Sequence, residues 1–222
     1  MIKVEHIETF GFEAAIRGMR NPMNSWEKSD SHLYCYNTHN VEDWGDVPKY
    51  AMNIGANDMD LMQRLYKGGT EHRKFMRQIF VSMDIAAPLY WWKEFDTYKV
   101  GTTANSCSTM HKIHSKEFTL DDFSHEHLMT GGIECIKHLC MDLNLCRNYY
   151  LETKDKEWWW QMIQLLPTSY NQKRTVTMTY ENAAAMIKQR SGHKLDEWRE
   201  FVEILKRLPY IAQIIGGCTA EM

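Results

Sequence analysis

The sequence predicts an α+β fold, in which a small sheet is flanked by long helices within a single domain spanning residues 1–222. Residues in Ile2–Ile7 and Arg174–Tyr180 alternate between apolar and polar, as they do in half-buried strands. Apolar residues three or four positions apart indicate amphipathic helices, most clearly at Ile133–Tyr150 and Lys194–Leu208. These elements follow no regular β–α–β alternation, which distinguishes an α+β protein from an α/β protein.

The composition is that of an ordinary globular protein. Hydrophobic residues make up 44% and charged residues 25% of the 222 positions, and no Pro/Ser/Gly-rich linker or internal repeat divides the chain. The net charge of −3 gives no indication of a nucleic-acid partner or of attraction to an anionic membrane. No apolar run is long enough to span a bilayer, and residues 1–20 lack the pattern of a signal peptide, so we expect a cytoplasmic protein.

The stretch from Ile79 to Met110 changes character along its length. An apolar, β-branched run ends in Ala86-Ala87-Pro88, and a block of aromatic residues follows. A polar tail then closes on the tetrapeptide Asn105-Ser106-Cys107-Ser108. A rigid scaffold that ends in polar residues is typical of functional sites. A buried strand followed by a core helix would explain the Trp pair, but explains less well the many hydroxyls and amides from Thr97 to Ser108.

Further elements follow from caps and breakers in the sequence. We expect Asn57, Thr70 and Thr153 to cap helices, and Thr119–Asp122 to form a capping box. We expect Gly131-Gly132 to separate that region from the next long helix. Expected helices lie at Phe12–Met19, Asn57–Tyr66, Glu71–Ile79, around Trp158–Trp160 after the Thr153 cap, and at Asn182–Arg190, and an irregular surface segment is expected at Asn24–Lys49.

Histidines and cysteines could form a metal site, but their spacing argues against one. Four histidines lie close together in the sequence, namely His111, His114, His125 and His127. No HExxH motif, paired Cys/His spacing or CxxC pair accompanies them, so we expect no metal. We interpret the histidines as polar surface residues and the six cysteines as reduced, mostly buried thiols.

Two kinds of chemistry remain open from the residues alone. Cys107 and Ser108 precede His111 and His114, but no GxSxG motif surrounds Ser108, so the pattern only weakly indicates a nucleophile. The chain also has no Walker loop and no GxGxxG motif, so a bound nucleotide would depend on side chains. The residues available for phosphate contacts are Arg174, Arg190, Lys99 and His193.

The order of these motifs resembles that of the flavin-dependent thymidylate synthases, from about residue 70 to 205. In that family an Ala/Gly-Pro strand end and an aromatic helix precede the signature RHRxxSxNExSxRY. Here Ala87-Pro88 precedes the aromatic block, and Asn105-Ser106-Cys107-Ser108 is similar to the N-E-x-S part, with Ser in place of Glu. Downstream, the family's order is kept by Leu166-Pro167, the strand at Arg174–Tyr180, the helix ending at Arg190, and His193.

The same signature departs from the family at its two ends. The basic triplet is replaced by Tyr98-Lys99-Val100 at strict spacing, or by Thr97-Tyr98-Lys99 if one residue is inserted. In either case only Lys99 keeps a charge. The closing Arg-Tyr is replaced by Met110-His111. In the family the triplet helps to bind flavin, and the later Arg helps to bind the nucleotide phosphate.

The resemblance implies an α+β homotetramer that methylates dUMP to dTMP. Methylenetetrahydrofolate would supply the carbon and reduced FAD the hydride, with NADPH as the reductant of the flavin. Ser108 and Arg190 would be catalytic. The residues implied on the flavin side are His72, Lys99, Asn105, Asn182 and His193, and those on the substrate side are Glu94, Ser108, Arg174 and Arg190.

Two other hypotheses stay open beside this one. A non-catalytic nucleotide-binding or regulatory protein on the same fold would fit the altered signature, and would bind nucleotide without turnover. A structural or interaction module without a small-molecule site would use the aromatic residues as core. Flavin binding separates the enzyme from both of these, and nucleotide binding separates the second hypothesis from the third.

Overall fold

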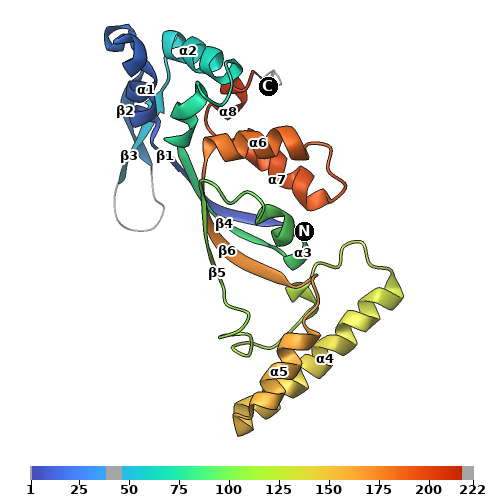
Figure 1. The fold of residues 1–222 in the computed structure, drawn as a ribbon. Helices are drawn as coiled ribbons and strands as arrows, with labels where there is room; N and C mark the ends of the chain where they lie inside the picture. Colours follow the sequence, from blue (N-terminus) through green and yellow to red (C-terminus); the bar gives the residue numbers. More distant parts are fainter. Residues whose placement is uncertain (1, 39–46, 217–222) are drawn as a thin grey trace. The chain divides into compact units, whose positions relative to one another are not determined.

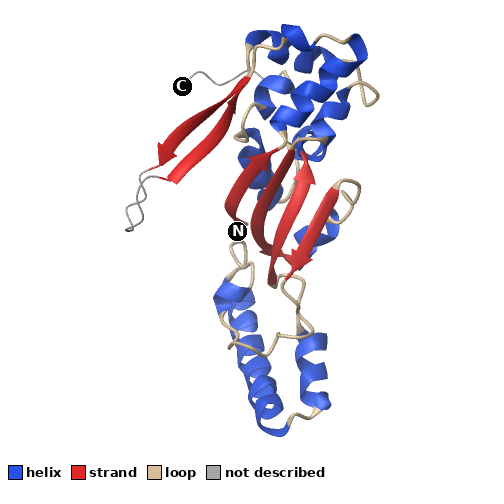
Figure 2. Ribbon diagram, turned by 90° about the vertical axis from the view of Figure 1, so that its left-hand side faces the viewer, coloured by secondary structure: helices blue, strands red, loops and turns tan. Residues whose placement is uncertain are grey.

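The computed structural model describes residues 2–38 and 47–216 and contains two sheets (Figure 1, Figure 2). The four-stranded sheet has the order β1–β4–β6–β5. Its strands are β1 (Lys3–Phe10), β4 (Phe80–Pro88), β6 (Asn171–Thr179) and β5 (Thr102–Ser106). The second sheet pairs β2 (His32–Thr38) with β3 (Val47–Asn53) in antiparallel register. A small sheet with several helices confirms the predicted α+β class.

The helices account for most of the remaining described chain. The α-helices are α1 (Phe12–Arg20), α2 (Ala56–Lys67), α3 (Leu89–Phe95), α4 (Thr130–Thr153), α5 (Lys156–Leu165), α6 (Tyr180–Arg190), α7 (Asp196–Lys206) and α8 (Ile211–Ile214). Short 3₁₀ turns occur at η1 (Asn21–Met23), η2 (Trp26–Lys28), η3 (Arg73–Arg77) and η4 (Leu120–Asp122). Within residues 2–38 and 47–216, every helix is too short or too polar to cross a membrane.

The chain forms two compact units, which are described separately. The first unit contains the N-terminal residues up to Ile7, together with Ser82–Thr177 and Gly192–Phe201. The second unit contains Glu8–Val81, Met178–Ser191 and the residues from Val202 onward. The expectation of one domain covering residues 1–222 stays a prediction.

Most elements with clear hydrophobic periodicity lie where the sequence predicts them. The strands β1 and β6 and the helices α1, α2, α4, α6 and α7 match their expected ranges within a few residues. The Thr119–Asp122 capping box is present, although it opens only the short turn η4. Periodicity identifies these elements because one face of each element packs on a core.

The prediction of an irregular segment at Asn24–Lys49 is wrong for its described part. His32–Thr38 is a strand, and Val47–Asn53 pairs with it. Residues 39–46 lie outside the described residues. Neither strand alternates clearly between apolar and polar residues, so the sequence carries no periodic signal there. The sheet is defined by the antiparallel pairing of the two strands.

Three expected caps and one expected helix are also corrected. The Glu71–Ile79 segment contains only the five-residue turn η3, and Thr70 does not cap it. Gly55 rather than Asn57 precedes α2, while Gly131-Gly132 lies inside the first turn of α4.

Thr153 ends α4 rather than capping α5, and its hydroxyl donates to the Tyr149 carbonyl at 2.7 Å. The Asp155 carboxylate caps α5 by accepting the Glu157 N–H at 3.0 Å. A carboxylate at the cap satisfies a free amide that Thr153 cannot reach.

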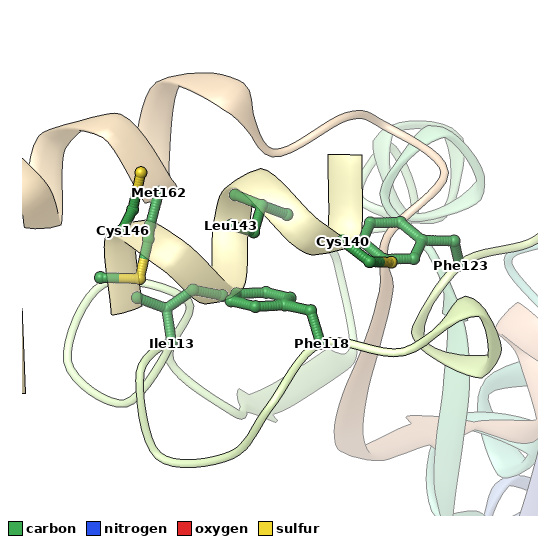
Figure 3. Packing of buried hydrophobic residues seen from close by; sticks show 7 residues of the cluster. All are labelled: Ile113, Phe118, Phe123, Cys140, Leu143, Cys146 and Met162. Carbon is green, nitrogen blue, oxygen red and sulfur yellow. The ribbon is translucent and has the colours of Figure 1, made fainter. Parts of the chain in front are cut away.

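Helices α4 and α5 lie side by side in the first unit and enclose a small core of their own (Figure 1). Figure 3 shows the buried side chains of this core, Ile113, Phe118, Phe123, Cys140, Leu143, Cys146 and Met162. Three of them, Ile113, Phe118 and Phe123, come from the segment between β5 and α4. This segment follows Ser108, so burial of its apolar residues anchors the chain on that side of the predicted site.

A second core in the first unit joins α3 to α7. Trp91 lies with its ring centroid 4.8 Å from Trp198 and 5.3 Å from Phe201, and all three are fully buried. Aromatic pairs at these separations add attraction beyond the area they bury. The aromatic block of the sequence is therefore mainly core, and this packing holds Glu94 of α3 near the segment that leads into α7.

A buried ion pair organises the start of the second unit. The Asp58 carboxylate accepts Arg20 Nε at 2.7 Å, and the Arg20 and Asp58 side chains are 5% and 0% exposed. Its other oxygen accepts the hydroxyls of Ser29 at 2.7 Å and Ser31 at 2.6 Å. Burial raises the pKa of Asp58, but the hydrogen bonds from Ser31, Ser29 and Arg20 outweigh it, so the net pKa is lowered. One carboxylate thus joins α1, α2 and the chain between them.

We predict that Asp58→Asn destabilises the protein by about 3–5 kcal/mol, because it leaves the Arg20 guanidinium buried without a counter-charge. Urea unfolding at pH 7 measures this change. Since the folded-state pKa lies below the unfolded value of about 4, the wild-type contribution is present above that value and is lost as the pH falls through the lowered pKa.

The matched control is Asp60→Asn, which removes an exposed carboxylate that pairs with Arg64 on the same helix. It should change the unfolding free energy by less than about 0.5 kcal/mol. Equal changes in unfolding free energy for the two substitutions would show that the buried pair stabilises the protein no more than the exposed pair does.

Candidate active site

Ser108 lies directly beyond the end of the edge strand β5 and lines a cavity of about 360 Å³. The chain here is attached to β6 by two hydrogen bonds. The Cys107 N–H donates to the Lys173 carbonyl at 2.9 Å, and Gln172 Nε2 donates to the Cys107 carbonyl at 2.9 Å. Because both ends of residue 107 are held, the position of Ser108 is determined by the sheet. The volume lies within the usual range of small-molecule sites, about 300–1,000 Å³.

The Ser108 hydroxyl is oriented by its own loop. Its oxygen accepts the N–H groups of Met110 at 3.2 Å and His111 at 3.0 Å. A serine hydroxyl that accepts two amides still has its hydrogen to donate. Ser108 can therefore donate a hydrogen bond to a carbonyl or phosphate oxygen in the cavity.

The loop that follows contributes to a second, smaller cavity of about 210 Å³. Met110, His111 and His114 line it, together with Tyr150, Lys156 and Trp159 of the helical hairpin. His114 Nδ1 is buried, and no described residue forms a hydrogen bond with it. Burial, with the nearby charges of Lys112, Lys154 and Arg147, lowers the pKa of His114, so its ring is neutral at pH 7. The loop residues are thus divided between two cavities.

Glu94 and His193, expected on the substrate and flavin sides respectively, lie together in the first unit. His193 Nε2 is 3.1 Å from Glu94 Oε2. The Leu195 N–H donates to His193 Nδ1 at 3.2 Å, so Nδ1 is the acceptor and Nε2 bears a hydrogen that points to Glu94. The pair can orient a ligand or hold a proton at Nε2.

Arg174 has several partners within the first unit. Its Nη1 donates to Asp96 Oδ1 at 2.7 Å and its Nε donates to Gln172 Oε1 at 2.9 Å. The guanidinium carbon also lies 4.2 Å from the centre of the Trp92 ring, a cation–π contact. A substrate would have to compete with these contacts, and the expected role of Arg174 in binding substrate stays a prediction.

The other expected residues are divided between the two units. In the first unit, Lys99 lies exposed after α3 and Asn105 lies exposed on β5. In the second unit, His72 is exposed before η3, Asn182 lies in the first turn of α6, and Arg190 is its partly buried last residue. Each role stays a prediction.

The structure also contains a buried carboxylate that the sequence analysis missed. Glu197 is 6% exposed, and the Tyr90 hydroxyl donates to its Oε1. Burial and the Glu197 carboxylate raise the pKa of Tyr90 to about 12. A signal was present in the sequence, because Glu197 precedes Phe201 by four positions and so shares the apolar face of α7.

Within the described ranges, no three His, Cys, Asp or Glu side chains gather as a metal ion would require. His125 bonds through Nδ1 to the Phe123 carbonyl at 2.7 Å, and His127 Nε2 lies 3.1 Å from Asp196 Oδ2. Cys107 is exposed and lines the larger cavity beside Ser108, whereas Cys140 and Cys146 are buried in the hairpin core. The expectation that most cysteines are buried is therefore wrong for Cys35, Cys107 and Cys135, which are exposed.

Solved structures of flavin-dependent thymidylate synthases share this fold. One is thymidylate synthase X (ThyX) from Helicobacter pylori with FAD and dUMP, at 16% identity and a TM-score of 0.64, covering 97% of each chain. Another is flavin-dependent thymidylate synthase ThyX from Helicobacter pylori complexed with FAD and dUMP, at 16% identity and a TM-score of 0.63, covering 96% of each chain. The sequence itself matches no protein-family model and no curated protein.

The likeness covers nearly the whole chain, so it concerns the complete fold rather than one motif. The chain has the fold of the flavin-dependent thymidylate synthases, at 16% sequence identity to both of these structures. This confirms the fold that the order of motifs predicted.

We predict that Tyr90→Phe destabilises the protein by about 1.5–3 kcal/mol, because it removes the hydroxyl that donates to the buried Glu197 carboxylate. Tyr149→Phe is the matched control, since Tyr149 is exposed on α4. The free energy of unfolding in urea should change little in the control.

A comparison of the wild type with Tyr90→Phe tests the pKa of Tyr90. The folded-state pKa of about 12 lies above the unfolded value near 10, so the stabilisation is present below pH 10 and is lost as the pH rises toward 12. In a difference titration at 295 nm, one tyrosine should ionise near pH 12 in the wild type and be missing from Tyr90→Phe. Ionisation of that tyrosine near pH 10 would contradict the hydrogen bond.

Proposed function

We propose that this protein is a flavin-dependent enzyme that methylates dUMP, or a closely related pyrimidine nucleotide, on its ring. Methylenetetrahydrofolate is the carbon source, reduced FAD the hydride source and NADPH the reductant. The observation that carries the proposal is the position of Ser108. The resemblance places this residue beside the pyrimidine, and in the structure it lines a cavity large enough for a small ligand with a hydroxyl hydrogen to donate.

The donors of the first unit fit a flavin nucleotide. Lys99 and Asn105 are both exposed and offer an ammonium and an amide, which suit phosphate oxygens and the polar edge of a flavin ring. Tyr98-Lys99-Val100 stands in place of the basic triplet, and Lys99 is its one cation. The Tyr98 ring lies 6.1 Å from Trp198, and the Val100 side chain is 90% exposed. Bound FAD would supply the hydride, which no amino-acid side chain can supply.

The polar residues of the chain would bind and polarise the pyrimidine. The Ser108 hydroxyl donates to a ring carbonyl, which gains negative charge as the ring is attacked. Arg190 has the matching role in the resemblance, where its guanidinium would place a cation beside the ring carbonyl. Glu94 holds His193 with Nε2–H directed toward its carboxylate, so the imidazole keeps one orientation in the site.

The proposal includes the assembly and the location implied by the resemblance, a homotetramer in the cytoplasm. Light scattering of the purified protein measures the assembly directly. The runner-up is a nucleotide-binding or regulatory protein on the same fold, which is favoured by the single cation left at the triplet position.

The first test is an absorption spectrum of the purified protein before and after addition of FAD and dUMP. We expect flavin bands that stay with the protein through gel filtration and that shift when dUMP is added, because both ligands occupy one site. A colourless protein that cannot be loaded with FAD but binds dUMP would contradict the enzyme and favour the regulatory protein.

We predict that Arg190→Ala lowers dUMP binding or turnover at least tenfold while the far-UV circular dichroism stays unchanged, because the developing charge loses its cation. Arg64→Ala is the matched control in the second unit, since Arg64 is exposed and pairs with Asp60 on its own helix. Unchanged turnover in Arg190→Ala would remove the role assigned to this residue.

A further inference from the structure

Lysines surround the cavity that contains Ser108. Lys112, Lys116 and Lys173 line it, and Asp122 is the one carboxylate in the same lining. Lys173 also pairs with Asp84, so three ammonium groups meet two carboxylates and one positive charge remains, although the chain as a whole carries −3. This local charge favours an anionic ligand.

Two of these lysines have their own carboxylate. Lys116 pairs with Asp122, and Lys173 Nζ lies 2.9 Å from Asp84 Oδ2. Asp122 also accepts the Thr119 N–H at 2.9 Å through its second oxygen, so both of its oxygens are occupied. The Asp84 carboxylate raises the pKa of Lys173, which keeps that ammonium charged.

Lys112 is different, because no carboxylate among residues 2–38 and 47–216 pairs with its ammonium. The side chain is exposed and carries its charge at the end of a four-carbon stem. Its N–H donates to the Ser108 carbonyl at 3.4 Å, so both residues belong to one tight turn. The hydroxyl residues Thr109 and Ser115 line the same cavity on either side of it.

Three residues of this unit were considered above for phosphate contacts, Arg174, Lys99 and His193, and none of them lines this cavity. The Arg174 guanidinium is held by Asp96 and Gln172 and stacks on Trp92, and Arg174 does not line this cavity. Met110, which replaces the closing Arg of the family signature, is uncharged and lines the smaller cavity. Lys112 is therefore the cation best placed to meet an anion that enters beside Ser108.

We propose that Lys112 binds the phosphate of a nucleoside monophosphate whose pyrimidine lies against Ser108. This inference rests on the proposed function, which places the pyrimidine at Ser108, and deepens it by naming the residue that selects a nucleotide over a nucleoside. A charged hydrogen bond to phosphate is strong enough for such selection.

The test is isothermal titration calorimetry of the full chain with dUMP, deoxyuridine and inorganic phosphate. We expect the wild type to bind dUMP at least tenfold more tightly than deoxyuridine. Lys112→Gln should weaken dUMP binding about tenfold or more and leave deoxyuridine binding unchanged, because only the phosphate contact is lost. Lys112→Arg should restore most of the affinity for dUMP.

Lys137→Gln is the matched control, since Lys137 is an exposed lysine of α4 that pairs with Glu134 outside the cavity. Unchanged dUMP affinity in Lys112→Gln would overturn this inference and leave the proposed function intact. Binding of inorganic phosphate that depends on Lys112, without any binding of dUMP or deoxyuridine, would support the anion site and overturn the pyrimidine substrate. A wild type that binds none of the three probes would overturn both.

Discussion

The buried amide of Gln172 joins the parts of the first unit on which the candidate site depends. Its Nε2 donates to the Cys107 carbonyl and its Oε1 accepts Arg174 Nε, while the backbone carbonyl of Gln172 accepts Trp92 Nε1 at 3.0 Å. One residue of β6 therefore holds the loop before Ser108, the stacked Arg174 and the helix α3. A buried amide of this kind is costly unless all of its groups are paired, so it defines one arrangement.

Both units contain buried carboxylates, and Asp58 and Glu197 are stabilised differently. Asp58 in the second unit has a buried guanidinium and two serine hydroxyls, which keep it charged. Glu197 in the first unit has the phenol of Tyr90 as its donor, and that phenol also lies 3.1 Å from Ser124 Oγ. A charged donor compensates desolvation more fully than a neutral one, so the Asp58 cluster is the more important for stability.

Elements with a strong period were predictable from the sequence, and elements defined by distant partners were not. The helix α7 and the strand β6 show their periods because one face of each packs on a core. The β2–β3 pair was missed, since its register is set between strands rather than within either one. The predicted cap of α5 was misplaced by two residues. Thr153 and Asp155 are both good cap residues, but the Thr153 hydroxyl bonds to the last turn of α4, and Asp155 caps α5.

For the site, the sequence alone supplied the candidate residues and predicted the fold to which they belong, because Ala87-Pro88, Ser108, Arg190 and His193 occur in a recognisable order. Only the tertiary structure decided which of them meet. It joined Glu94 to His193 across 99 positions, engaged Arg174 with Asp96, and brought Lys173 of β6 to the cavity of Ser108. Such neighbours depend on how elements pack, since charges far apart in a chain interact only when the fold brings them within a few ångströms.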